Sequence, residues 1–192
     1  EAPLDPEDLE RLATATYMMG RDEESESYRT RAHQIFLERG DSEKAAGAAC
    51  LLGFGLMQRG ARAPASGWFA RAQRIVDEAH LDSVVSGYLL IPTAIQRIGQ
   101  GDPEAGHAAF ARAADIAGRF GDRDLASICC SGRGRALIRL GQIVEGVALL
   151  DEAMAAVIAG DVTSIPAGDV YCTVLEGCQE ICDVRRSYEW MI

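Results

Sequence analysis

The chain has 192 residues, 48% of them hydrophobic, which excludes a disordered polymer and allows one large domain or a short array of repeats. Its 29 acidic residues outnumber its 19 basic ones, so the formal net charge of −10 argues against direct contact with nucleic acid. No apolar run approaches the roughly 18 residues needed to cross a bilayer, and the acidic opening EAPLDPEDLE lacks the features of a secretory signal, so we expect a cytoplasmic protein without membrane contact.

The first predicted helix begins in LDPEDLE, residues 4–10, where Asp5 can cap the helix and Pro6 can take an early helical position. It ends at the first of several residues that recur at a nearly constant interval. These are Gly20, Gly60, Gly101, Gly141 and Cys182, which are 40, 41, 40 and 41 residues apart. Such an interval indicates an internal repeat.

Apolar residues before each of these positions recur with a period near 3.6, as in AACLLGFGLMQRG at residues 48–60. Strand-like alternation is nearly absent, so the predicted fold class is all-α. Glycine can end the first helix of a pair in a left-handed conformation. In GDPEA, residues 101–105, Asp102 then caps the second helix and Pro103 begins it.

A second stop-and-start signal separates successive pairs, with ERGD at residues 38–41 and RFGD at residues 119–122. We therefore predict a single repeat domain, 1–192, of helical hairpins at residues 5–40, 41–81, 82–122 and 123–162, with the start of a fifth at 167–192. Pro92 falls inside the first helix of the third unit, where it should kink or begin that helix.

The second helices share a small residue, a large apolar residue and an alanine. The three clear examples are Ala65, Phe69 and Ala72, then Gly106, Phe110 and Ala113, then Gly146, Leu150 and Ala153. Small residues let antiparallel helices approach closely, and the large residue fills the neighbouring hairpin. The first unit, with Ser25, Arg29 and Ala32, fits this pattern less well.

These residues resemble the tetratricopeptide repeat, whose pattern is matched by Leu52 and Gly53 in one helix and by Ala65, Phe69 and Ala72 in the next. The period exceeds the usual length of about 34 residues for that family. The resemblance implies antiparallel helical hairpins stacked into a right-handed superhelix. Phrases such as FLERGD, LGFGLMQRG, ASGWFARAQR and VYCTVLEGCQEICDVRRSYEW are also similar to the helical-repeat region of actinobacterial LuxR-type multidomain transcriptional regulators.

The family geometry implies that certain positions of each first helix line a concave groove. On this alignment they are Phe54, Met57, Gln58, Tyr88, Ile91, Ile95, Arg135, Arg139, Glu176 and Glu180. The apolar members could hold an amphipathic peptide or an apolar effector, or they could be ordinary packing between repeats.

Arg135 and Arg139 are four residues apart, a geometry suited to an anion, and Glu176 and Glu180 occupy the equivalent positions one repeat later. The better-supported interpretation is a ladder that pairs Arg135 with Glu176 and Arg139 with Glu180.

No pattern of residues indicates catalysis, a cofactor or a metal. The six cysteines include no CxxC pair, since Cys172, Cys178 and Cys182 have gaps of six and four, and buried thiols are the favoured interpretation. His33, His80 and His107 lack an evident catalytic partner, and no hydrolase, metalloprotease or nucleotide-binding motif occurs.

The expected protein is a non-enzymatic sensing module of a LuxR-type regulator that binds a protein, a peptide or a small effector. The resemblance implies an output domain elsewhere that reads DNA. The alternatives are a freestanding scaffold for protein assembly and an enzyme with an unrecognised site. Because the chain starts without Met and ends inside a predicted helix, we expect a fragment of a longer polypeptide. We also expect a homo-oligomer through the C-terminal end, where Trp190 and Met191 would lack a covering repeat.

Overall fold

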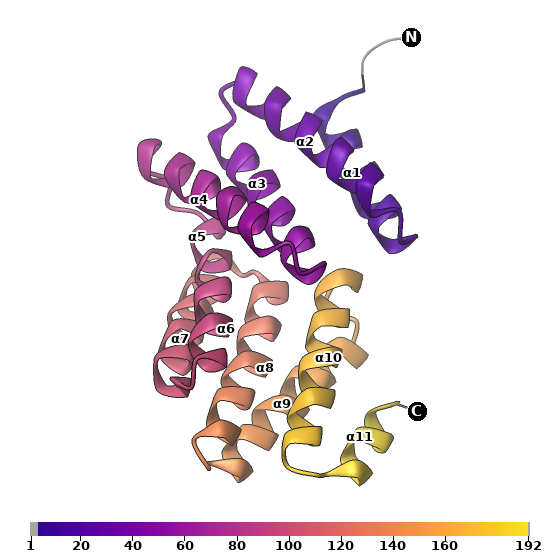
Figure 1. Ribbon diagram of the computed structural model, residues 1–192, viewed down its shortest axis with the longest axis vertical. Helices are drawn as coiled ribbons and strands as arrows, with labels where there is room; N and C mark the ends of the chain where they lie inside the picture. Colours follow the sequence, from indigo (N-terminus) through magenta and orange to yellow (C-terminus); the bar gives the residue numbers. More distant parts are fainter. Residues whose placement is uncertain (1–3, 192) are drawn as a thin grey trace. The chain divides into compact units, whose positions relative to one another are not determined.

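A computed structural model describes residues 4–191, and within that range the secondary structure is helical throughout, without strands (Figure 1). The all-α prediction is confirmed. The helices are α1 (Pro6–Met18), α2 (Asp22–Glu38), α3 (Ser42–Gln58), α4 (Arg62–Glu78), α5 (Val85–Tyr88), α6 (Leu90–Gly99), α7 (Pro103–Phe120), α8 (Arg123–Arg139), α9 (Ile143–Ile158), α10 (Ser164–Glu180) and α11 (Val184–Met191).

The helices belong to two compact units that meet in sequence between Leu89 and Leu90. In the first unit α1 packs on α2, α2 on α3, α3 on α4, and the short α5 on both α3 and α4. In the second unit α6 packs on α7, α7 on α8, α8 on α9 and α10, and α10 on α11. The unit boundary falls inside the third predicted hairpin, between α5 and α6, the two pieces of its predicted first helix.

Each predicted helix-ending residue adopts a left-handed backbone. Gly101 has φ +86°, and the N–H of Asp102 after it donates to the carbonyl of Arg97 over 3.0 Å, closing the end of α6. Cys182 takes the same conformation with φ +57° although it carries a side chain. The turns therefore form through local hydrogen bonds that capture the last carbonyls of a helix.

The predicted caps agree with the structure except at the first helix. Asp102 accepts from the N–H of Ala105 at 3.1 Å, and Pro103 is the first residue of α7, as predicted. Asp5 precedes α1, but its side chain makes no cap hydrogen bond. Its carboxylate instead pairs with the guanidinium of Arg39 at 2.7 Å, so the prediction of Asp5 as a capping side chain is wrong.

Pro92 lies in the first turn of α6, which begins at Leu90 directly after the break at Leu89. In the first turn the missing proline N–H removes no helical hydrogen bond. Of the two effects predicted for Pro92, the beginning of a helix is the one observed.

The core of the second unit is built around Leu150 of α9, which is fully buried between the backbones of α8 and α10. A Cβ added to Gly177 of α10 would lie 2.6 Å from its Cδ1, and one added to Gly134 of α8 would lie 3.0 Å from its Cδ2. The same cluster includes Met154, Val170 and Val174. Small residues therefore let the helices approach, as the repeat pattern predicts.

The first unit contains a buried polar group in its core. His33 of α2 is 1% exposed, its Nδ1 lies 2.8 Å from the carbonyl oxygen of Ala45, and its Nε2 accepts from the Nε of Arg71 at 2.7 Å. Its ring packs edge-on against Trp68. Because Nε2 accepts, Nδ1 carries the proton and donates to Ala45, so both ring nitrogens are satisfied by the neutral form.

This environment predicts a pH-dependent stability. Burial lowers the pKa of His33, Arg71 lowers it further, and the hydrogen bond to Ala45 opposes the shift in part. Since the folded pKa lies below the unfolded value of about 6.5, the stabilisation is complete above that pH and is lost as the pH falls toward the folded pKa. We expect His33→Gln to lower the Tm more at pH 7.5 than at pH 5.5, in differential scanning fluorimetry.

The matched control is His80→Gln, since His80 is exposed. A loss of Tm in His33→Gln that is the same at both pH values would contradict the assignment of neutral His33.

Candidate functional site

The charged candidates lie together in the second unit, on α8 and α10. The guanidinium of Arg135 pairs with the carboxylate of Glu176, and Arg139 Nη2 pairs with Glu180 Oε1 at 2.6 Å. Both predicted rungs of the ladder are therefore present. Arg135 Nη2 also reaches Glu180 Oε1 at 2.9 Å, so Glu180 accepts from both arginines and the ladder is cross-linked.

Glu180 is the centre of this cluster. Partial burial by itself would raise the pKa of Glu180, but hydrogen bonds and charges from Arg139 and Arg135 outweigh it and lower the pKa. Arg139 donates in addition to the carbonyl oxygen of Ile98 at 3.2 Å, which ties α6 to the same group of charges. The arginines are thus engaged by carboxylates of their own chain, which favours a ladder over an open anion site.

We expect the ladder to align the helices with little effect on stability. A double-mutant cycle of Arg139→Gln and Glu180→Gln should give a coupling of about 0.2–1 kcal/mol, because both side chains are partly solvated and exposed pairs contribute little. The coupling, measured by urea denaturation, should shrink in 1 M salt, where charges are screened. A coupling above about 2 kcal/mol that resists salt would mean that the ladder is a major source of stability.

The apolar candidates of the first unit are partly used for packing. Phe54 lies against Phe69 with ring centroids 5.1 Å apart, and Phe54 and Tyr88 are both partly buried beside the same core cluster. Met57 is half-buried, and the exposed Gln58 accepts a hydrogen bond from the hydroxyl of Tyr17. Gln58 at the end of α3 therefore remains accessible to a partner, whereas Phe54 packs against the core.

The two remaining apolar candidates, both on α6 in the second unit, differ from each other. Ile91 is 3% exposed and belongs to the interior, whereas Ile95 is 47% exposed. Of this pair, only Ile95 presents apolar surface that a partner could contact.

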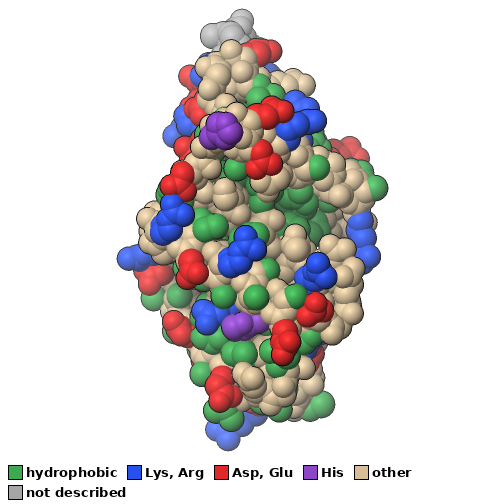
Figure 2. Space-filling view, turned by 90° about the vertical axis from the view of Figure 1, so that its left-hand side faces the viewer, with side chains coloured by type: hydrophobic (Ala, Val, Ile, Leu, Met, Phe, Trp, Pro, Cys, Tyr) green, Lys and Arg blue, Asp and Glu red, His purple; other side chains and the backbone are tan. Residues whose placement is uncertain are grey.

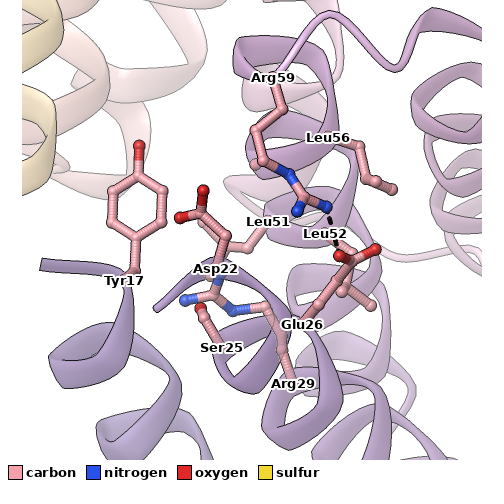
Figure 3. A pocket seen from close by; sticks show the side chains of 10 residues that line it. Tyr17, Asp22, Ser25, Glu26, Arg29, Leu51, Leu52, Leu56 and Arg59 are labelled. Carbon is pink, nitrogen blue, oxygen red and sulfur yellow. Dashed lines mark hydrogen bonds and ion pairs between the residues drawn. The ribbon is translucent and has the colours of Figure 1, made fainter. Parts of the chain in front are cut away.

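The structure adds residues that the alignment of first helices did not single out. A hollow in the first unit is lined by Tyr17, Asp22, Ser25, Glu26, Arg29, Leu51, Leu52, Gly55, Leu56 and Arg59 (Figure 3). Its open volume, which includes space continuous with solvent, is about 270 Å³. Glu26 and Arg59 form an ion pair beside it, drawn as a dashed line.

Arg29 is the least expected member of this set, because it is only 7% exposed. Its Nε is buried without a hydrogen-bond partner. The sequence contained a signal for it: Arg29 stands where the later hairpins place Phe69, Phe110 and Leu150, at intervals of 40, 41 and 40 residues. Arginine is rarely buried in a protein core, so packing alone does not explain its presence at this position of the repeat.

The cysteines behave in part as predicted. Burial raises the pKa of Cys50 to about 12 and that of Cys129 to about 12, so these thiols stay protonated and are poor nucleophiles. Cys178 is also buried, whereas Cys172 and Cys182 are exposed. Residues 4–191 contain no group of three His, Cys, Asp or Glu side chains placed to hold a metal ion.

Trp190 in the C-terminal helix α11 contacts other helices of the chain, contrary to the prediction. The indole Nε1 of Trp190 donates to Asp151 at 3.1 Å, and its carbonyl accepts from the hydroxyl of Tyr171 at 3.1 Å. Arg186 pairs with the same Asp151. Trp190 therefore has partners on α9 and α10, and the expectation that it lacks cover is wrong for this residue. Met191 is 55% exposed.

The surface charges and the helix lengths add two observations. On the face shown in Figure 2, basic and acidic side chains alternate, without the gathering of positive charge typical of a nucleic-acid surface. None of the helices in residues 4–191 has both the length and the apolar character needed to span a bilayer.

No protein-family model matches the chain, and no curated protein matches its sequence. Solved structures do match it. One is a putative kinesin light chain of Podosopora anserina with nearly identical TPR-like repeats, 14% identical, covering 96% of this chain and 90% of that chain with a TM-score of 0.55. A variant of it is also 14% identical and covers 99% and 94% with a TM-score of 0.57. This likeness concerns the fold, and it shows that the chain has a TPR-like helical-repeat fold.

Proposed function

We propose that the chain is a non-enzymatic module that binds a protein or peptide partner. The observation that carries the proposal is the TPR-like repeat fold, an architecture suited to protein interaction. Repeats of this kind place equivalent residues of successive helices side by side, as the ladder on α8 and α10 illustrates. A partner can then be contacted by the same face of several helices.

We further propose that the partner lies along the first helices of the hairpins, one surface in each unit. In the first unit this surface includes the half-buried Met57 and the exposed Gln58. In the second it includes Ile95, Arg135 and Glu176, and the side chain of Glu176 is 52% exposed. Mixed polar and apolar side chains of this kind suit an amphipathic peptide better than a purely apolar effector.

The biological setting that we propose is a LuxR-type transcriptional regulator in which this module senses a partner and another domain contacts DNA. The resemblance of FLERGD, LGFGLMQRG and VYCTVLEGCQEICDVRRSYEW supports this setting. The net charge of −10 agrees with a module that does not itself touch nucleic acid. The alternative is a freestanding scaffold, and a helix-turn-helix segment in the complete reading frame would favour the regulator.

The test is selection of peptides from a random displayed library against the full chain, followed by calorimetry. Met57→Lys and Glu176→Lys should each weaken the selected peptides of their unit at least about tenfold, which corresponds to about 1.4 kcal/mol. The matched control is Glu145→Lys, an exposed position on the second helix α9. Peptides that bind all variants equally, or a library that yields no binder, would refute the proposal.

Self-association through α11 stays a prediction. Val184, Tyr188 and Met191 are 77%, 62% and 55% exposed, and clustered exposed apolar side chains indicate a contact surface. We expect the chain to form a dimer at high concentration and Tyr188→Glu to return it to a monomer, as measured by light scattering. A wild-type chain that stays monomeric at high concentration would contradict the prediction.

A further inference from the structure

Arg29 of α2 is a buried cation whose Nε has no hydrogen-bond partner. Within residues 4–191 no hydrogen bond or ion pair joins its guanidinium to another side chain, and its Nε is fully enclosed. Burial lowers the pKa of Arg29, and the electrostatic effects of Glu10 and Tyr17 oppose this shift only in part. Burial of a cation that no carboxylate accepts a hydrogen bond from costs free energy, so packing by itself does not account for Arg29.

The free-energy cost of burying Arg29 is not imposed by the repeat, because an apolar residue can occupy the same position. Later hairpins carry Phe69, Phe110 and Leu150 at the same place, and these side chains fill the space beside glycines of first helices. At Arg29 the corresponding space is the hollow between α1, α2 and α3. An apolar residue would close that hollow, whereas an arginine keeps it open and charged.

The walls of the hollow define what would fit in it. Leu51, Leu52 and Leu56 supply an apolar side, and Figure 3 shows Arg29 extending beneath Asp22 and beside Ser25. Arg59, the other cation of the hollow, is already paired with Glu26. Asp22 supplies a second carboxylate, so the four charged side chains of the hollow balance, and Arg29 is the cation among them whose Nε has no hydrogen-bond partner.

Two carboxylates beside the hollow set the charge that it accepts. Asp22 and Glu26 both line it and would repel a dianion about twice as strongly as a monoanion, because Coulomb energy scales with charge. A carboxylate has one negative charge and matches the planar guanidinium with two parallel hydrogen bonds. An aliphatic stem next to that carboxylate would contact the leucines.

We propose that the hollow at Arg29 binds the carboxylate of an acidic residue in a peptide partner, with Arg29 as the recognising group. The inference rests on the proposed function of peptide binding and specifies the chemistry of the partner in the first unit. The net charge of −10 implies that the partner carries such a residue within a neutral or basic segment, since a largely acidic segment would be repelled.

The binding test uses NMR titration of the full chain with blocked tripeptides, acetyl-Leu-Glu-Leu-amide and its Gln counterpart. We expect the Glu peptide to bind at least about tenfold more tightly than the Gln peptide and to perturb residues around the hollow. Arg29→Gln should remove this difference. The matched control is Arg31→Gln, an exposed arginine on the same helix, which should preserve it.

Two further probes distinguish the sources of the anion. Sodium propionate should bind more weakly than the Glu peptide, and inorganic phosphate more weakly still. If propionate binds as tightly as the Glu peptide, the ligand need not be a peptide, and the proposed peptide partner is refuted. If phosphate binds more tightly than the Glu peptide, the preference of the hollow for a monoanion is refuted. Equal affinity for the Glu and Gln peptides would overturn the whole inference.

A stability measurement tests Arg29 without any ligand. Replacement of an unpaired buried charge by an apolar residue of similar length removes a cost, so Arg29→Met should keep or raise the Tm. A fall in Tm larger than that of Arg31→Gln would show that Arg29 is satisfied in the free protein and would overturn the inference. Library peptides that bind the first unit with affinity unchanged by Arg29→Gln would leave peptide binding standing while refuting the role of Arg29.

Discussion

Gly146→Ala is expected to lower the free energy of unfolding by about 3 kcal/mol, toward the upper end of the cost of overpacking. At Gly146 the backbones of α8 and α9 are in contact. A Cβ there would lie 2.6 Å from the carbonyl oxygen of Gly134 and 3.0 Å from the backbone nitrogen of Ile138. The reverse contact is equally tight, since a Cβ on Gly134 would lie 2.7 Å from the carbonyl oxygen of Gly146.

Neither neighbour can yield cheaply, because both are backbone atoms of α8, whose position is fixed by its packing on α7, α9 and α10. The matched control is Gly168→Ala in α10, where an added Cβ meets nothing within 4 Å. There the same substitution should stabilise the protein by about 0.5–1 kcal/mol, since alanine has the better helix propensity. Urea denaturation followed by circular dichroism gives both values, and a Gly146→Ala variant as stable as Gly168→Ala would contradict the close approach of α8 and α9.

Leu150→Ala is expected to cost about 2–5 kcal/mol, the range for truncating a fully buried leucine. Leu150 is 0% exposed and inserts between the glycine-lined faces of α8 and α10, so its removal leaves a cavity that rigid helix backbones cannot fill. The neighbouring Met154 is the side chain best able to relax into the space, because it is unbranched and flexible.

The control for this cavity is Ile158→Ala in the same helix, α9. Ile158 is 69% exposed, so its truncation should change the free energy of unfolding by no more than about 0.5 kcal/mol. The difference between the two variants, measured under the same denaturing conditions, isolates the contribution of burial. A Leu150→Ala variant within about 1 kcal/mol of the wild type would mean that the second unit repacks freely around α9.

The candidate site could be predicted from the sequence where it depends on the repeat period. Arg135 and Glu176 are 41 residues apart, as are Arg139 and Glu180, so one repeat interval brings each pair together on neighbouring helices. The diagonal contact from Arg135 to Glu180 was not predictable in the same way. It depends on side-chain conformations that a one-dimensional alignment does not contain.

The apolar candidates show where the alignment fails. The period places Phe54 and Ile91 on first helices, but it does not state which face of each helix is covered by its neighbours. Phe54 packs against Phe69 of its own hairpin, and Ile91 is buried. Ile95, one turn later, is exposed.

By itself the sequence determined the helices, their pairing into hairpins and the turns between them, because glycine, aspartate and proline act through hydrogen bonds and backbone angles within a few residues. Tertiary structure alone decided the hollow beside Arg29, the cover that Asp151 and Tyr171 give Trp190, and the division into units at Leu89. Those features depend on side chains brought together from distant parts of the chain. Their free energies are therefore set by the packing of whole helices, which no local pattern records.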